Sequence, residues 1–276
     1  MKFSLIIATY NRKNELANCL YSLSLQTYKN FEVIIVDQTE NSTLKDLCDF
    51  YKEKYFLDIK YFYSKIKGGS IARNIGINFA KGDILTFPDD DCEYYPETLK
   101  EVCDFFKKNK NVDALLGKIE DKNGKNIIRE WPQTEKIIKK SNFFLLYSAI
   151  TLFVKNSKDI IKFSEELGSG LKFGAYEDAD YILRLLDLSK NIIYSPKIRL
   201  WHPEIDKNNI QKIYSYGLGF GYFCRKNLSL YTIYLFLLVL IYHLIILIKG
   251  ILKFDKKLMK QGYYSLISRI IGFLKR

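Results

Sequence analysis

The stretch FSLIIA, residues 3–8, is a strand-sized apolar run that ends at the polar residues TYNR and precedes a helical pattern from Lys13 to Leu25. A second apolar run, FEVIIVD (31–37), precedes another helical pattern over residues 43–55. Short apolar runs that alternate with helical patterns are typical of β-α-β units, whose parallel strands are buried on both faces. The sequence therefore predicts an α/β fold with a mostly parallel central sheet flanked by helices.

The same alternation continues through the first half of the chain. LDIKYFY (57–63) precedes the helical pattern SIARNIGINFAKG (70–82), and DILTF (83–87) precedes an acidic cluster. Pro96 and Glu97 are expected to open a further helix, because proline is favoured in the first helical turn. In an open sheet of this kind, ligands bind beyond the carboxyl ends of the strands.

Composition and cysteine content limit the class of protein. The chain has 276 residues, 48% of them hydrophobic and 27% charged, which predicts a globular protein with one principal domain plus an appendage. Its five cysteines form no C-x-x-C pair and are odd in number, which favours reduced thiols in the cytosol. The N-terminal apolar run is too short for a signal peptide, so we expect the catalytic part to stay in the cytoplasm.

The positive charge is concentrated near the C-terminus. Residues 207–276 contain twelve Lys or Arg and one acid, whereas residues 1–206 carry 31 basic and 30 acidic residues. This basic tail contains the apolar run LSLYTIYLFLLVLIYHLIILI (228–248). As a helix the run would be about 31 Å long, close to the thickness of the hydrocarbon core of a bilayer.

Three interpretations of this run remain open. It could span a membrane, although basic residues on both of its flanks would then lie on opposite sides, against the positive-inside rule. It could instead lie in the membrane interface as a hairpin whose second limb is GYYSLISRIIGFLKR (262–276). The third possibility is the buried core helix of a soluble protein. Basic residues among Tyr, Leu and Ile suit anionic lipid headgroups at the cytoplasmic face of a membrane.

Three adjacent carboxylates stand out in FPDDDCEYYPETL, residues 87–99. Like charges repel one another, so the cluster is either an acidic turn in water or is neutralised by something positive. Asp89 and Asp91 are separated by one residue and could reach one cation while Asp90 points elsewhere. Mg²⁺ or Mn²⁺ would take such oxygens and complete its shell with substrate phosphates.

Two further polar clusters follow strands. Thr9, Tyr10, Asn11 and Arg12 come directly after the first strand, and Asp37 with Gln38 ends the second. Because the carboxyl ends of parallel strands share one edge of the sheet, we expect these clusters and the acidic turn to form one site.

A glycine-rich turn opens the helix of GGSIARNIGI, residues 68–77. Gly69 permits close approach of a backbone, and Ser70 is a candidate N-cap beside free N–H groups. Arg73 stays charged and does not complement the helix dipole there, so it faces either a phosphate or a carboxylate, or is simply solvated.

Two motifs in the second half carry candidate catalytic groups. Glu177 and Asp178 begin the helical pattern of AYEDADYILRLL (175–186), where they either cap the helix or supply Asp178 as a general base. His202 ends SPKIRLWHPE and is one of two histidines in the chain. A lone histidine is more often structural, but imidazole is also a good ligand for Mn²⁺.

The combined motifs resemble glycosyltransferase family 2, the inverting nucleotide-sugar transferases of the GT-A fold. They occur in the family's order and cover the chain from Phe3 to about Lys226: LIIATYNR, FEVIIVDQ, GGSIARNIGI, FPDDDCEYYPETL, AYEDADYILRLL and YGLGFGYFCRK. The resemblance implies a Rossmann-like GT-A domain in residues 1–206, with a nucleotide-sugar-binding half (1–116) and an acceptor-binding half (117–206). Membrane-associating helices would follow in residues 207–276.

The resemblance also implies a role for individual residues. The implied nucleotide-sugar-binding residues are Thr9, Tyr10, Arg12, Asp37, Gly69, Arg73, Asp89 and Asp90, and the implied ligands of Mn²⁺ or Mg²⁺ are Asp89, Asp91 and His202. Asp178 would be the catalytic base, and Glu177 and Trp201 would lie at the acceptor site.

The implied reaction moves one sugar from a nucleoside-diphosphate sugar to a hydroxyl of a lipid-linked glycan, with inversion. The chain lacks the Gln-x-x-Arg-Trp motif of processive synthases, which favours single-sugar addition, as in enzymes of surface-polysaccharide biosynthesis. A polyprenyl-phosphate sugar synthase is the first alternative, and a sugar-nucleotide nucleotidyltransferase is a more remote one. A nucleic-acid binder is disfavoured, because the positive charge lies among apolar residues and no binding motif accompanies it.

Overall fold

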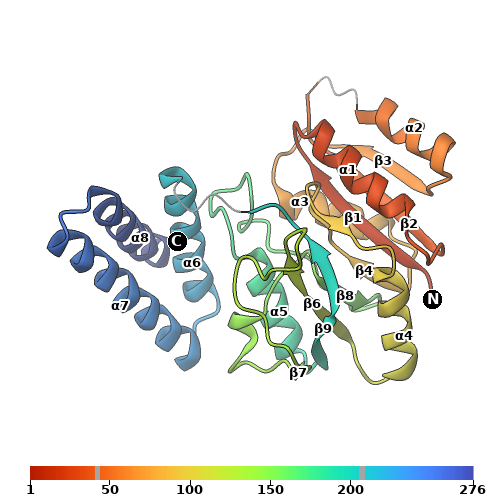
Figure 1. Ribbon diagram of the computed structural model, residues 1–276. Coiled ribbons are helices and arrows are strands. Elements are labelled where there is room, and N and C mark those ends of the chain that lie inside the picture. Colours follow the sequence, from red (N-terminus) through yellow and green to blue (C-terminus); the bar gives the residue numbers. More distant parts are fainter. Residues whose placement is uncertain (41–43, 205–208, 276) are drawn as a thin grey trace. The chain divides into compact units, whose positions relative to one another are not determined.

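A computed structural model describes residues 1–40, 44–204 and 209–275 (Figure 1). Contacts divide the described chain into two compact units. The first comprises Met1–Lys162 and Ile182–Glu204, and the second comprises Phe163–Tyr181 with the helices that follow residue 208. The expected domain boundary between residues 206 and 207 lies outside the described residues, so the domain division made from the sequence stays a prediction.

One mixed sheet forms the centre of the first unit. Its strands within the described residues are, in spatial order, β3 (Ile59–Tyr63), β2 (Phe31–Asp37), β1 (Phe3–Thr9), β4 (Ile84–Thr86), β8 (Leu152–Lys155), β6 (Ala114–Glu120), β9 (Ile192–Trp201) and β5 (Glu93–Tyr94), while β7 (Lys136–Ile137) also pairs with β9. The first four run parallel, and so do β6 and β9. The α/β architecture expected from the sequence is confirmed. The antiparallel strands β5, β7 and β8 are additions that the alternation of patterns did not predict.

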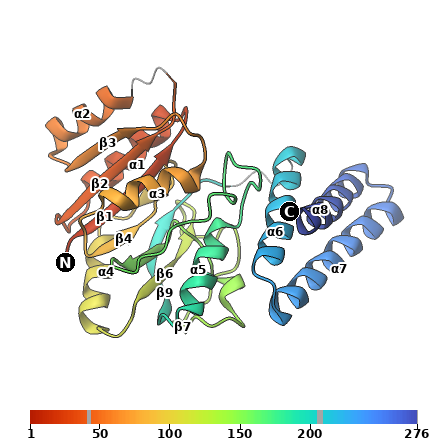
Figure 2. The ribbon, with the colours of Figure 1, turned by 180° about the vertical axis from the view of Figure 1, so that it is seen from behind.

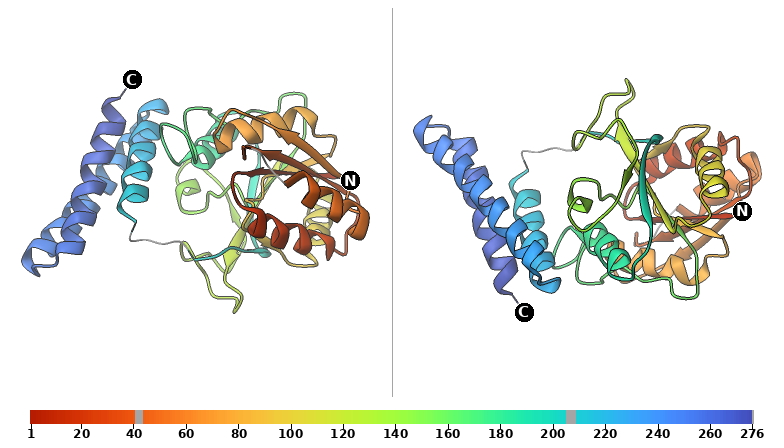
Figure 3. Two further views of the ribbon diagram at one scale, coloured as in Figure 1. Left: turned by 90° about the horizontal axis from the view of Figure 1, so that it is seen from above. Right: turned by 90° about the horizontal axis from the view of Figure 1, so that it is seen from below.

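Helices cover both faces of the sheet. The helices α1 (Lys13–Ser24), α2 (Leu44–Tyr55) and α4 (Thr98–Lys108) pack on one face, and α3 (Gly69–Phe79) packs on the other (Figure 2 and Figure 3). Along β1, Leu5 and Ile7 point into the first layer, whereas Ile6 points towards α3. Gly76 of α3 allows this approach, since a Cβ atom there would lie 2.3 Å from Cγ2 of Ile6.

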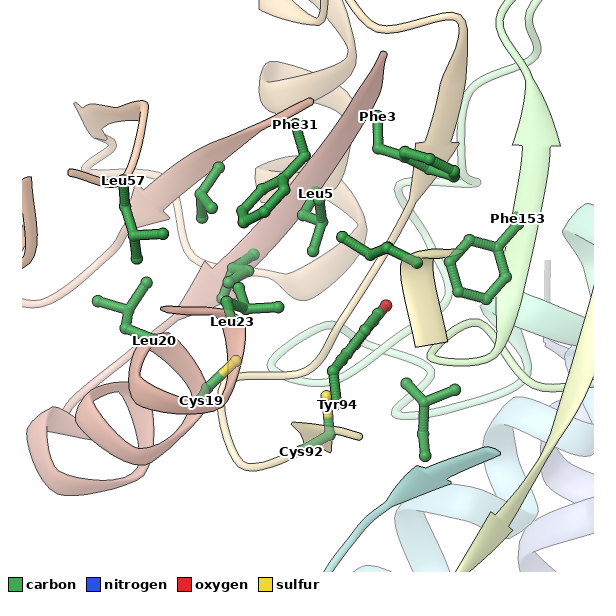
Figure 4. Close-up of a cluster of buried hydrophobic side chains, with 14 of the residues drawn as sticks. Phe3, Leu5, Cys19, Leu20, Leu23, Phe31, Leu57, Cys92, Tyr94 and Phe153 are labelled. Carbon is green, nitrogen blue, oxygen red and sulfur yellow. The ribbon is translucent and has the colours of Figure 1, made fainter. Parts of the chain in front are cut away.

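The apolar core fills the space between the sheet and the first helical layer (Figure 4). Phe153 of β8 packs edge-on against Phe3 and Tyr94, with ring centroids 6.5 Å and 6.3 Å apart. The hydroxyl groups of Tyr94 and Thr86 lie 3.1 Å apart, which satisfies both of these buried polar atoms. All five cysteines fall within the described residues, and each is buried and free of a disulfide.

Two element boundaries differ from the expected ones. The strand β3 begins at Ile59 and not at residue 57. The helix α4 begins at Thr98 with Glu97 as its N-cap, so Pro96 precedes the helix and does not lie in its first turn as expected. The reason is that Thr98 N–H closes a turn on the carbonyl of Tyr95, while the carbonyl of Pro96 accepts a hydrogen bond from Thr27 N–H.

The second unit contains the helices α6 (Ile210–Lys226), α7 (Leu230–Leu252) and α8 (Lys256–Leu274). The helix α8 packs against both of the others, and small residues let the backbones approach: a Cβ atom on Gly221 would lie 2.1 Å from the carbonyl oxygen of Arg269. The apolar run is thus helical, with its hairpin limb beginning at Lys256, earlier than expected. Asp255 caps that limb by accepting hydrogen bonds from the N–H groups at 257 and 258. The short helix η1 (Phe143–Leu145) belongs to the first unit, and the helix α5 (Glu177–Asp187) begins in the second.

A buried carboxylate links β1, β2 and β3 near their amino ends. The side chain of Glu32 on β2 is fully buried and accepts hydrogen bonds from Ser4 Oγ (2.6 Å), Lys60 Nζ (2.7 Å) and Lys81 N–H (2.6 Å), with Lys2 Nζ 3.1 Å away. Burial alone would raise the pKa of Glu32, but the bonds from Lys60 and Ser4 outweigh it and lower the pKa from 4.5 to about 2.

We predict that Glu32→Gln destabilises the protein by about 3 kcal/mol at pH 7, because it leaves buried cationic and N–H groups without their anion. The folded-state pKa is the lower one, so the contribution of Glu32 is complete above pH 4.5 and is lost as the pH falls towards 2. Urea unfolding of both proteins at pH 7 and pH 3 measures this, with Glu53→Gln on the exposed side of α2 as the control. A difference in stability that does not shrink at pH 3 would contradict the assignment.

Candidate functional site

The carboxyl ends of the parallel strands bring three polar segments to one edge of the sheet. Thr9 and Asp37 are paired residues at the ends of β1 and β2. The acidic turn follows β4, and its first residue, Asp89, forms a parallel bridge with Ala8 of β1. The strand register therefore sets these segments side by side, at the edge where the sequence places the site.

Two arginines offset the charge of the acidic turn. Nη1 of Arg12 lies 3.0 Å from Oδ1 of Asp90 and 2.6 Å from Oδ2 of Asp91. Nη2 of Arg73, the fifth residue of α3, lies 2.7 Å from Oδ1 of Asp89. Of the alternatives considered for Arg73, the structure shows a carboxylate partner, and the arginine is buried.

The middle aspartate is directed into the protein. Asp90 is only 5% exposed, and burial raises its pKa to about 6, an effect that the charge of Arg12 only partly offsets. The side chains of Asp89 and Asp91 are more exposed, at 38% and 15%. Asp90 is therefore suited to holding the turn on Arg12, whereas Asp89 and Asp91 each pair with an arginine and are also partly accessible.

Asp89, Asp91 and His202 form a cluster with the composition of a metal site. One ligand atom from each lies within 4.8 Å of the others. His202 directly follows Trp201, the last residue of β9. Trp201 pairs with Glu93 of β5, which lies two residues after the acidic turn, and this pairing places His202 beside the turn.

The orientation of the imidazole supports this interpretation. Nδ1 of His202 lies 2.6 Å from the carbonyl oxygen of Pro203, which can only accept, so Nδ1 carries the hydrogen. In the neutral ring Nε2 then presents a lone pair to Oδ1 of Asp91, 3.4 Å away. That oxygen is buried without a hydrogen-bond partner among the described residues. Two facing acceptors are stabilised by a shared cation, so the residues fit a divalent metal such as Mn²⁺.

The residues expected to hold a nucleoside lie at the same edge of the sheet, at the ends of β1 and β2. Asp37 is buried, and its carboxylate accepts hydrogen bonds from Tyr61 Oη (2.7 Å) and from the N–H of residue 39 (2.8 Å). Gln38 donates through Nε2 to the carbonyl oxygens of Ile66 (2.5 Å) and Gly68 (3.2 Å). Gly68 has φ of 133°, a conformation that favours glycine, and α3 starts at the next residue, Gly69.

Tyr10 lies half exposed beside a lysine that the sequence did not single out. Nζ of Lys67 is 3.0 Å from Oη of Tyr10 and 4.7 Å from the centre of its ring. A lone lysine in a loop gives no periodic signal. Lys67 and Tyr10 are 57 positions apart in the sequence, so only the fold shows that they are in contact.

Glu177 and Asp178 lie on the first turn of α5, in the second unit. Oδ1 of Asp178 accepts a hydrogen bond of 2.8 Å from Ala179 N–H, and Tyr176 ahead of the helix has φ of 75°. The metal cluster belongs to the first unit, so a cleft shared by Asp178 and the cluster stays a prediction. Trp201 ends β9 in the first unit, with Nζ of Lys122 4.6 Å from its ring centre.

Comparison with protein families identifies the class. Residues 4–159 match the model of Glycosyl transferase family 2, so more than half of the chain is covered and the chain belongs to this family. The fold agrees with the identification, because solved members of the GT-A class superpose on it.

Two curated relatives and two solved structures illustrate the likeness. The chain is 30% identical over 129 residues to poly(ribitol-phosphate) beta-N-acetylglucosaminyltransferase TarS of Staphylococcus aureus, and 34% identical over 130 residues to poly(ribitol-phosphate) beta-glucosyltransferase of Bacillus spizizenii. Each match covers 46% of this chain but only 22% and 20% of the relative, so the chain spans about a fifth of their length. The crystal structure of TarS 1–349 with UDP-GlcNAc matches 81% of this chain and 66% of its own, with a TM-score of 0.63 and 24% identity. A mannosyltransferase from Pyrobaculum calidifontis, in complex with GDP-Man and Mn²⁺, matches 98% of this chain and 73% of its own, with a TM-score of 0.62 and 12% identity.

We predict that Asp91→Asn and His202→Ala each weaken Mn²⁺ binding by roughly tenfold or more, because each removes a ligand atom from the cluster. Electron paramagnetic resonance of free Mn²⁺, titrated into the purified protein with UDP present, measures the affinity. Asp49→Asn on the surface of α2 is the control for the loss of one carboxylate. Unchanged affinity in both site variants would show that the metal is held elsewhere.

Proposed function

We propose that this protein transfers a single sugar from a nucleoside-diphosphate sugar to an acceptor hydroxyl, with inversion and with the help of Mn²⁺ or Mg²⁺. The observation that supports the proposal most directly is the cluster of Asp89, Asp91 and His202 at the carboxyl edge of the strands, with its buried unpartnered oxygen. Membership of the family supplies the reaction class.

The donor side of the proposal rests on the first unit. A bound divalent cation would offset the negative charge that develops on the departing nucleoside diphosphate. Arg12 pairs with Asp90 and Asp91, and Arg73 pairs with Asp89, which supports a turn positioned by the protein itself. Thr9, Tyr10 and Asp37 are proposed to receive the nucleoside, with Gly69 allowing close approach of the diphosphate. The complexes of related structures with UDP-GlcNAc and GDP-Man support this class of donor.

On the acceptor side, Asp178 is proposed to take the proton of the attacking hydroxyl. As the proton moves to the carboxylate, the hydroxyl oxygen forms its bond to the anomeric carbon while the bond to the diphosphate breaks on the opposite face. One displacement of this kind inverts the configuration. Glu177 and Trp201 are proposed to contact the acceptor. Both curated relatives are named for poly(ribitol-phosphate), which supports a surface glycan as the acceptor class.

We further propose that the second unit attaches the enzyme to the cytoplasmic face of a membrane. The helix α7 is 23 residues long, and its most apolar stretch has a mean hydropathy of 2.6 and is only 11% buried. Its exposed side chains follow a helical stripe: Leu230, Ile233, Tyr234, Leu237, Leu238, Ile241, Tyr242, Leu244, Ile245, Ile248, Ile251 and Leu252. The opposite side packs on α8. One apolar face backed by protein favours a helix that lies in the interface, and a lipid-linked acceptor would explain why the enzyme needs this attachment.

We predict that the purified protein releases nucleoside diphosphate, and no pyrophosphate, from one member of a panel of nucleotide sugars in a Mn²⁺-dependent hydrolysis assay. Asp178→Asn should slow this release by about 10²–10⁴-fold with Mn²⁺ affinity unchanged, because the amide accepts no proton. Asp187→Asn, at the far end of the same helix, is the matched control. Pyrophosphate release would favour a nucleotidyltransferase, and full activity of Asp178→Asn would remove this residue as the base.

We predict that replacing the exposed lysines at the α7–α8 turn by glutamine weakens binding to vesicles containing anionic lipid, by about 1 kcal/mol for each lysine. The variant carries glutamine at Lys253, Lys256, Lys257 and Lys260. Vesicle flotation measures binding, and donor hydrolysis without vesicles should be unchanged. A control with glutamine at four exposed lysines of the first unit has the same net charge: Lys45, Lys100, Lys107 and Lys108. Equal loss of binding in both variants would point to a non-specific effect of charge.

A further inference from the structure

The segment that carries the proposed base is fixed by α6. The ring of Phe173 stacks on Tyr222 of α6 with centroids 3.9 Å apart. Gly219 lets the helix approach the segment closely, since a Cβ atom there would lie 2.6 Å from the carbonyl oxygen of Ala175. Phe163–Tyr181 therefore belongs by packing with the C-terminal helices. The first turn of α5 takes its position from them.

An ion pair between a buried carboxylate and a partly exposed lysine joins α5 to α6. Asp180 lies on the first turn of α5 and is fully buried. Nζ of Lys226 is 3.0 Å from its Oδ1 and 3.1 Å from its Oδ2, and Nδ2 of Asn227 donates to Oδ1 at 3.0 Å. A buried carboxylate that loses its cation is costly, so this contact fixes the end of α6 against the start of α5.

The end of α6, which contacts Asp180, is also hydrogen-bonded to the apolar helix α7. Thr232, in the first turn of α7, is fully buried and donates through Oγ1 to the carbonyl oxygen of Asn227 at 2.8 Å. Ser229 caps α7 and shares a capping box with Thr232. Asn227 therefore holds α7 with its backbone and Asp180 with its side chain. The end of α6, the start of α7 and the start of α5 meet at this residue.

We propose that Lys226 and Asn227 are positioning residues for Asp178, which they orient through Asp180. The inference rests on the proposed function, in which Asp178 is the base. Asp178 and Asp180 share one helical turn, so a shift of the buried carboxylate rotates the turn and displaces the base. Catalytic rates fall steeply when a reacting group moves by about 1 Å. The residues proposed to bind the donor lie in the first unit and outside this turn, so we expect donor binding to be preserved.

The experiment compares Lys226→Gln with Lys226→Arg in donor hydrolysis without vesicles. We expect Lys226→Gln to lower kcat by about tenfold or more and to leave the KM for the donor within about twofold. Arginine keeps the charge and should restore most of kcat. Arg225→Gln removes the neighbouring charge on the exposed side of α6 and should leave kcat unchanged. A wild-type kcat in Lys226→Gln, or an equal loss in Arg225→Gln, would overturn the inference.

A second set of variants separates positioning from a general loss of folding. Asp180→Asn keeps the shape of the side chain and should lower kcat to a similar extent. The double variant with Lys226→Gln should lose no more than the worse single variant, because both changes break one contact. Losses that multiply would overturn the inference. Thermal unfolding and Mn²⁺ affinity are measured for every variant, so a loss of kcat counts only where both are preserved. A wild-type protein without hydrolysis would instead refute the proposed function.

Discussion

Electrostatic compensation of three adjacent carboxylates is the constraint on which the site depends. Asp89, Asp90 and Asp91 cannot share one turn as anions unless positive groups face them. Arg12 bridges the second and third, and Arg73 holds the first. One oxygen of Asp91 remains buried and faces the lone pair of His202. The arginines thus stabilise the turn and leave a defined position for a cation.

The sheet explains why these groups meet. Parallel pairing of β1, β2 and β4 sets their carboxyl ends at one edge, which supplies Asp37 and the acidic turn. The antiparallel strand β8 is inserted between β4 and β6, and β9 lies beyond them. The short strand β5 turns back from the acidic turn to pair with the end of β9, and this pairing delivers His202. The cluster of Asp89, Asp91 and His202 therefore takes its carboxylates from the turn after a parallel strand and its histidine from the mixed half of the sheet.

The second unit packs the segment that leads to Asp178 together with the C-terminal helices. Its outer helix α7 exposes an apolar stripe, and its helix α6 holds the segment that leads to Asp178. Asp180 and its partners connect the end of α6 to the start of α5. If Asp178 is the base and α7 the membrane contact, the enzyme's attachment and its acceptor chemistry share one structural element. The donor-binding residues then lie in a unit of their own.

The sequence by itself determined the elements of the first half, the acidic turn, the family and the long apolar helix, because periodicity and motif spacing are properties of near neighbours along the chain. It placed Asp91 and His202 together only through resemblance to a family. The partnership of Arg12 with Asp90, the role of Lys67 beside Tyr10, and the ion pair of Asp180 were decided by tertiary structure alone. These contacts join residues dozens of positions apart, and which segments become neighbours depends on strand order and helix packing, which no local pattern encodes.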